Sequence, residues 1–309
     1  MKARVLLLLG LMAPTGLAAD LKVAVLHPLL GDLARQVGGD QVEVVDLIGA
    51  DGDPHKFEPG PQELQQARGA QLYLASGKGL ESYLEKLKGI VGEERVFEVG
   101  AGLPTLTATS LCEHHDHAPA EDGNEEGEEH HHHHEVDDPH WWHSLDCWGR
   151  AARVVAKRLG ELDPDNAEDY RKRAGEARRN FATLNRWAER ELAKVPAERR
   201  VLATAHAAFA YFCHDYGWRM LPVQGLNREQ VASPRFVGEV ARVIKEEKVA
   251  ALFPEMQSNP KMLQTLSEQL GVRIGKPLNA AGGASIEEMI RHNVTTIVAT
   301  LAEPVAAAP

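Results

Sequence analysis

The sequence predicts an α/β protein with two lobes joined by one long helix. Apolar segments of strand length alternate with helical segments over residues 21–99, and the same alternation returns after residue 200. Between these two regions lies a helical stretch that contains no Pro from residue 165 to residue 194. Strands separated by helices favour parallel pairing, with the helices covering the sheet. We therefore expect two mainly parallel sheets connected by a long backbone helix.

In the first half of the chain, short apolar runs indicate strands and the segments between them carry helix signals. Pro28 directly precedes one expected helix, and Pro61 stands in the first turn of another, a position that tolerates Pro. The expected strands are 21–26, 42–47, 72–75 and 96–99, and the expected helices are 29–37, 61–68 and 80–87.

The second half begins with helical sequence at 144–162, followed by the long segment after Pro164, which exceeds the usual length of a globular helix. Further strands are expected at 201–203, 219–223 and 249–253, and helices at 207–215, 234–247, 260–270 and 286–301. The predicted organisation is a signal peptide (1–19), an N-terminal lobe (20–112), a His- and acid-rich mobile loop (113–138), the end of the N-terminal lobe (139–163), a linking helix (164–195) and a C-terminal lobe (196–309).

The first residues have the pattern of a cleavable secretory signal. Lys2 and Arg4 precede the apolar run 5–12, and small residues follow at Ala18 and Ala19. No Cys comes directly after the run, so we expect cleavage near Ala18–Asp20 and a periplasmic protein without a lipid anchor. The formal net charge of −11 argues against nucleic acid as a partner.

Three cysteines, an odd number, are present in a chain expected in an oxidising compartment. One disulfide and one free thiol is one possibility, but the sequence does not identify the pair among Cys112, Cys147 and Cys213. Cys112 also adjoins a group of histidines, so metal binding and semi-burial as an ordinary thiol both remain open for it.

Three histidines stand in similar settings, each in or just after a loop that should follow a strand, where α/β sheets place ligands. His55 and His140 each follow an Asp-Pro pair, and His206 follows the strand expected at 201–203. Pro restricts its own backbone and that of the preceding residue, so it stiffens a loop that presents an imidazole. Each His alone is more often an ordinary polar loop residue, but the repeated Asp-Pro-His favours a joint role. Neutral imidazoles suit zinc, copper or nickel.

These motifs resemble a known family. The run Asp53-Pro54-His55-x-Phe57-Glu58-Pro59, the His140 motif and His206 before Phe209 and Tyr211-Phe212 are similar to the metal-binding proteins of ATP-driven metal importers, most of all the zinc-binding, ZnuA-type branch. The sequence 289–293 also resembles the last helix of that family, and the similarity spans the mature chain. The resemblance implies two four-stranded α/β lobes, a long connecting helix, a metal ion in the cleft, an ABC membrane permease as partner, and no catalysis.

The resemblance also implies the ligands. His55, His140 and His206 are expected to bind the ion, and His206 replaces the Glu of manganese-binding relatives, which favours zinc because imidazole is the softer ligand. Family members commonly have an Asp in the loop after the last strand, whereas here residues 277–283 contain no carboxylate. Water, Glu255 or a group from the loop remain as candidates for the fourth position. Glu58 is a candidate to orient an imidazole from outside the ligand shell.

The segment 113–135 holds eight of the fifteen histidines among many acidic residues and almost nothing apolar. Such a composition cannot form a core. We interpret the segment as an accessory, lower-affinity zinc collector that delivers metal to the nearby His140 by effective concentration. Its candidate ligands are His114, His115, His117, His130, His131, His132, His133 and His134.

The sequence therefore predicts a monomeric periplasmic receptor with high affinity for Zn²⁺ that delivers the ion to an ABC-type importer. Because the ligands must be deprotonated, binding should weaken as the pH falls through about 6.5, the reference value for imidazole. Two alternatives remain. A secreted zinc-dependent hydrolase would need a general base and a substrate pocket, and no His-Glu-x-x-His motif is present. A free-standing periplasmic zinc buffer or chaperone would use the same ligands without a transporter.

Overall fold

The computed structural model describes residues 21–107, 137–223, 234–256 and 258–302. The predicted signal peptide and nearly all of the predicted 113–138 loop, with its eight histidines and Cys112 beside it, lie outside these described residues. No helix among the described residues combines the length and the apolar content needed to cross a bilayer.

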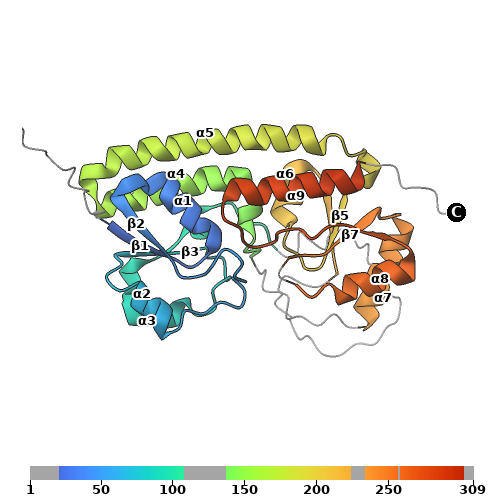
Figure 1. Ribbon diagram of the computed structural model, residues 1–309, viewed down its shortest axis with the longest axis horizontal. Helices are drawn as coiled ribbons and strands as arrows, with labels where there is room; N and C mark the ends of the chain where they lie inside the picture. Colours follow the sequence, from blue (N-terminus) through green and yellow to red (C-terminus); the bar gives the residue numbers. More distant parts are fainter. Residues whose placement is uncertain (1–20, 108–136, 224–233, 257, 303–309) are drawn as a thin grey trace, which may run out of the picture.

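The N-terminal lobe contains a parallel sheet in the order β2-β1-β3-β4. Its strands are β1 (Leu21–Val25), β2 (Val42–Asp46), β3 (Leu72–Ala75) and β4 (Val96–Glu98), and its helices are α1 (Pro28–Gly38), α2 (Pro61–Gln66) and α3 (Leu84–Val91). The central strand β1 pairs Val23 with Val44 on one side and with Leu72 on the other. Strand β1 is almost fully buried, because helices cover both faces of the sheet (Figure 1).

The C-terminal lobe repeats this design with a parallel sheet in the order β6-β5-β7-β8. Its strands are β5 (Val201–Thr204), β6 (Arg219–Pro222), β7 (Ala251–Phe253) and β8 (Arg273–Ile274). Its helices are α6 (Ala210–Tyr216), α7 (Pro234–Glu246), α8 (Lys261–Leu270) and α9 (Ile286–Leu301). In Figure 1, α6 and α9 lie on the same side of their sheet as α1 and α4 (Leu145–Leu162) do in the other lobe.

Helix α5 (Ala167–Leu192) connects the two lobes and runs along both of them (Figure 1). It packs on α4 (Leu145–Leu162) and α1 at one end and on α9 at the other. Beneath it, one hydrophobic core continues from the first lobe into the second and includes Leu33, Trp148, Phe181 and Ile297. Because the lobes share this core, large movements of one lobe against the other would expose apolar surface.

The two-lobe α/β prediction with a long helix is confirmed, but three elements differ from expectation. Helix α3 begins at Leu84 rather than at residue 80, and α6 begins at Ala210 rather than just after His206. A tight bend takes the place of the first turn of α6, since the His206 carbonyl accepts hydrogen bonds from the Ala208 amide and from the Thr204 hydroxyl. Strand β8, with two residues, was too short to be recognised from an apolar pattern.

Direct hydrogen bonds also join the lobes. The amide of Ile286 donates to Asp32 at 2.8 Å, and the amide of Gly283 donates to the carbonyl of Ala50 at 2.9 Å. The Tyr211 hydroxyl lies 3.1 Å from the carbonyl oxygen of Pro104. These contacts hold the lobes in one relative position.

The disulfide that the cysteine count left open does not form between the two described cysteines. Cys147 and Cys213 are both buried free thiols. Burial raises the pKa of Cys147 to about 11 and raises the pKa of Cys213 further, so both thiols stay protonated near neutral pH.

A buried carboxylate lies in the loop between β3 and α3. Glu81 is 5% exposed and accepts hydrogen bonds from the amides of Ser76 and Gly77 at 2.6 and 2.9 Å. The carbonyl of Ser76 in turn accepts from the Trp141 indole and from Gly100, where a Cβ would lie 2.4 Å from that oxygen. Glu81 thus fixes the loop against which Trp141 packs.

Burial raises the pKa of Glu81 from 4.5 to about 7, although the two amides oppose the shift. The native state therefore holds this proton more tightly than the unfolded chain does. Stability from Glu81 is present below pH 4.5 and is lost as the pH rises to about 7, which corresponds to about 3 kcal/mol. In urea unfolding without metal, we expect the free energy of unfolding of the wild type to fall by about 3 kcal/mol relative to that of Glu81→Gln between pH 4.5 and pH 7.5. A difference between the two proteins that does not change with pH would contradict this account.

Candidate metal centre

Three histidines from separate loops of the two lobes meet at one place. His55 lies in the loop between β2 and α2, His140 stands just before α4, and His206 follows β5. One ligand nitrogen from each ring can be chosen so that all three lie within 4.8 Å of one another. The ring centroids are 5.0 to 5.5 Å apart.

The spacing of the nitrogens suits a small tetrahedral ion. Nε2 of His55 lies 3.1 Å from Nε2 of His140. Zinc–nitrogen bonds of about 2.0–2.1 Å in a tetrahedron place two ligand nitrogens roughly 3.4 Å apart. The first pair is therefore close to the required separation, and the third ring needs to shift by no more than about 1.5 Å.

The two Asp-Pro-His motifs form the same local bend. The amide of His140 donates to Oδ1 of Asp138 at 2.9 Å, and the amide of His55 donates to Oδ1 of Asp53 at 3.2 Å. An Asp that bonds to the backbone two residues later is a common turn, and the intervening Pro restricts the backbone further. The repeat in the sequence thus has a structural cause, since it builds a rigid turn that presents an imidazole.

Buried carboxylates orient two of the three rings. Nδ1 of His140 lies 2.7 Å from Oδ1 of Asp138, and Nδ1 of His206 lies 2.5 Å from Oε2 of Glu255. All four side chains are fully buried. When Nδ1–H donates to a carboxylate, the neutral ring leaves the lone pair of Nε2 for a metal ion. Glu255 also accepts from the backbone amide of His206 at 2.9 Å, so both of its oxygens hold this residue.

Two further histidines beside the three rings are neutral near pH 7. His27 and His143 are buried nearby, with Trp142 in ring contact with both and with His140. Burial and the neighbouring imidazoles lower the pKa of His27 to about 3 and that of His143 to about 3. Both rings are therefore neutral near pH 7 and do not repel a cation at the candidate centre.

The loop at 277–283 contributes backbone rather than a carboxylate. The carbonyl of Ala280 accepts hydrogen bonds from the Trp142 indole and from Nε2 of His143, both at 2.9 Å. The Asn279 side chain accepts from the amides of Ala281 and Gly282 and closes the turn. This C-terminal loop thereby fixes the residues that directly follow His140.

The structure locates the other predicted site residues as follows. Glu255 lies beside His206, as described above, whereas the Glu58 carboxylate is half exposed and pairs with Lys86 at 2.7 Å. The eight histidines of the 113–135 segment lie outside the described residues.

Sequence reasoning used the Asp of each Asp-Pro-His motif only as part of the motif and did not assign it a role. Asp138 holds His140 through both the backbone and the ring, and Trp142 lies against the same imidazole. The repeated spacing, with Asp two residues before each His, was the signal that could have identified Asp138 and Asp53.

The fold and the three converging histidines suit a metal-binding receptor, and comparison with known proteins shows that class. Residues 23–300 match the family model for the periplasmic component A of a zinc-uptake complex, so the chain belongs to this family of ABC-importer receptors. As a member, it is a periplasmic metal-binding receptor of an ABC importer.

Individual relatives differ in the metal that their names give. The chain is 29% identical over 300 residues to the manganese-binding lipoprotein MntA of Bacillus subtilis, covering 93% of this chain and 92% of that one. It is also 29% identical over 300 residues to the zinc-binding protein TroA of Treponema pallidum, at 92% and 91% coverage. The crystal structure of ZnuA has a TM-score of 0.75 and 25% identity, covering 91% of this chain and 99% of that one.

The carboxylate–imidazole pairs predict a matched mutational result. Asp138→Asn and Glu255→Gln should each weaken metal binding by roughly 10- to 100-fold, because each removes the negative acceptor that orients a ring. Glu58→Gln serves as the control, since its exposed pair with Lys86 contributes little. Calorimetric titration would measure all three. Equal losses in the control and in either test variant would contradict the assignment.

Proposed function

We propose that this protein is a high-affinity receptor for Zn²⁺, which it delivers to an ABC-type membrane importer. The observation that carries the proposal is the convergence of His55, His140 and His206, whose possible ligand atoms lie within 4.8 Å of one another. Buried carboxylates already orient two of these three rings. The proposed ligands are the Nε2 atoms of the three histidines. A water molecule, or a group from the 113–136 segment, completes the tetrahedron.

The donor set supports zinc over manganese. Three imidazole nitrogens suit zinc, whereas Mn²⁺ favours carboxylate and other oxygen ligands. Oδ1 of Asp138 accepts hydrogen bonds from the amide and ring of His140, and the two oxygens of Glu255 accept from the amide and ring of His206. They therefore act as orienting acceptors in this proposal rather than as ligands.

The burial of the three rings suggests the route of the ion. His140 and His206 are fully buried, whereas His55 is part-exposed on a loop next to exposed Asp51 and Lys56. The hydrogen bonds and the core shared between the lobes oppose a wide opening. We infer that zinc enters and leaves on the His55 side, through a local displacement of that loop, when the permease binds.

The histidines of the 113–135 segment have a separate role in this proposal. They bind further zinc at lower affinity and raise its concentration near His140, which follows the segment closely in the chain. Their affinity is lower because binding must order a long segment, while the central ligands are already held by short turns.

Replacing His206 provides the sharpest test of the metal preference. His206→Ala should weaken the tightest zinc site by at least about 100-fold, because only two ring ligands remain. His206→Glu should reduce the preference for Zn²⁺ over Mn²⁺ by about tenfold or more, since it adds an oxygen donor. Competitive titration of both metals against a chelator would measure each value. His214→Ala, an exposed histidine on α6, is the control, and full zinc affinity in His206→Ala would refute the site.

Zinc uptake by cells distinguishes a receptor from a zinc buffer. A strain that lacks this protein should grow poorly and take up little ⁶⁵Zn under zinc limitation, and the wild-type gene should restore both. His140→Ala should fail to restore uptake although the protein accumulates normally. Unchanged initial uptake rates in the deletion strain would instead support a free-standing buffer.

A further inference from the structure

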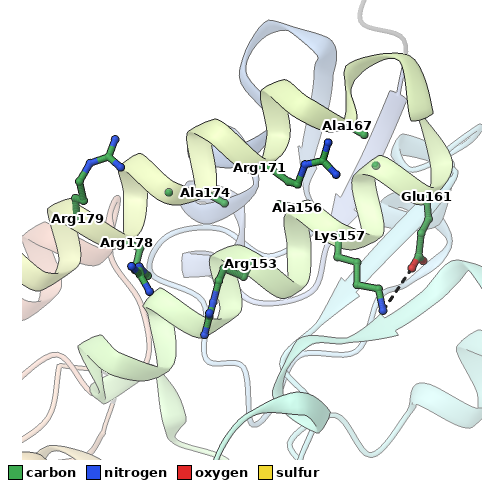
Figure 2. A pocket seen from close by; sticks show the side chains of 11 residues that line it. Arg153, Ala156, Lys157, Glu161, Ala167, Arg171, Ala174, Arg178 and Arg179 are labelled. Carbon is green, nitrogen blue, oxygen red and sulfur yellow. Dashed lines mark ion pairs between the residues drawn. The ribbon is translucent and has the colours of Figure 1, made fainter.

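The outer surface of α4 and α5 carries a basic hollow of about 680 Å³, here called the arginine groove (Figure 2). Arg153 and Lys157 line it from α4, and Arg171, Arg178 and Arg179 line it from α5. Its floor consists of small residues, so the basic side chains stand at the rim with room between them: Ala156, Gly160, Ala174 and Gly175. A second hollow, shared by Arg153 and Arg178, extends the groove toward the start of α4.

Most of this positive charge is not neutralised within the described part of the chain. Arg153, Arg178 and Arg179 are exposed and form no ion pair with any described residue. The acidic residue that lines the groove, Glu161, already pairs with Lys157 and Arg158. A groove with several unpaired cations in a chain of net charge −11 requires an explanation.

The complementary charge lies in the same chain. Residues 113–136 contain nine of the 45 acidic side chains and none of the 34 Lys and Arg. This segment alone therefore accounts for most of the net charge of −11, and it is the most acidic stretch of the sequence.

The groove is also within reach of that segment. Thr107 and Asp137 pair in an antiparallel bridge, so the intervening chain leaves and returns at one place. Half of its length, fully extended, spans about 45 Å at roughly 3.3 Å per residue. The near end of the groove, at Leu145 and Asp146, is eight to nine residues beyond Asp137 and so at most about 30 Å away.

We propose that the acidic segment 113–136 docks in the arginine groove of its own chain. Individual exposed ion pairs are weak, so docking depends on several pairs at once and is sensitive to salt. The short tether raises the effective concentration of the segment to the millimolar range, which favours contact within one molecule. If the segment also collects zinc, as proposed above, arginine and metal compete for the same acidic stretch. The docking itself does not require metal.

Paramagnetic broadening in the full-length protein tests the docking. A nitroxide is attached in a Cys112→Ser/Gly127→Cys variant, where the buried, protonated thiols of Cys147 and Cys213 resist labelling. In metal-free, low-salt buffer with chelator, amide signals of 150–160 and 171–179 should lose more than half of their intensity. This loss of intensity should disappear in 0.5 M NaCl. It should also disappear when Arg153→Glu and Arg178→Glu are introduced together into the spin-labelled variant. The matched pair Arg190→Glu/Arg242→Glu, outside the groove, should retain it.

Each other outcome overturns the proposal. Absence of broadening on α4 and α5 at low salt, or broadening that survives the Arg153→Glu/Arg178→Glu change, removes the groove as the docking site. Broadening that appears only between molecules, in a mixture of spin-labelled and isotope-labelled chains, identifies a second copy as the occupant. If the amide signals of groove residues shift when phosphatidylglycerol vesicles are added, but are not broadened by the nitroxide, the occupant is an anionic lipid surface instead.

Discussion

The structure depends on two buried carboxylate–imidazole pairs, Asp138 with His140 and Glu255 with His206. A carboxylate without a partner would be costly to bury, and each one here is stabilised by a ring N–H and a backbone N–H of the same histidine. The pairs fix the orientation of each ring before any ion arrives, so that little entropy is lost on binding. They also place negative charge on the Nδ1 side of each ring, where it would stabilise a cation bound at Nε2 without occupying a coordination position.

The long helix explains how two lobes can form a preorganised site. His140 comes from the first lobe and His206 from the second, so the distance between them depends on how the lobes are held. Helix α5 packs on both lobes, and the core beneath it is continuous. The Trp142 and His143 bonds to Ala280 then join the lobes directly beside the metal centre. The site therefore owes its geometry to the whole architecture as well as to its three loops.

Local patterns in the sequence were sufficient to predict most of the fold. Buried strands such as β1 and β3 are continuous apolar runs, and the absence of Pro from 165 to 194 indicated the long helix. The errors arose where tertiary contacts override local preference. Glu81 holds the loop that precedes α3, the bend at His206 takes the place of the first turn of α6, and β8 has two residues that pair with β7.

The three converging histidines were accessible from the sequence because their motifs are local, whereas only one of the two carboxylates that hold them was. Asp138 acts within its own motif and could have been inferred from the repeated spacing. Glu255 is 49 residues from His206, and only the adjacent ends of β5 and β7 bring them together. Glu58, the sequence candidate for orienting an imidazole, pairs with Lys86 on the surface. Long-range pairing of this kind depends on sheet order, which a single sequence does not specify.

The central claim is that three imidazoles share one zinc ion. X-ray absorption at the zinc edge, on protein loaded with less than one equivalent so that the tightest site fills first, tests it most directly. The account predicts a tetrahedral spectrum with nitrogen or oxygen neighbours at about 2.0–2.1 Å and the outer-shell scattering of three imidazole rings. A first shell with sulfur, or ring scattering from fewer than three imidazoles, would contradict it.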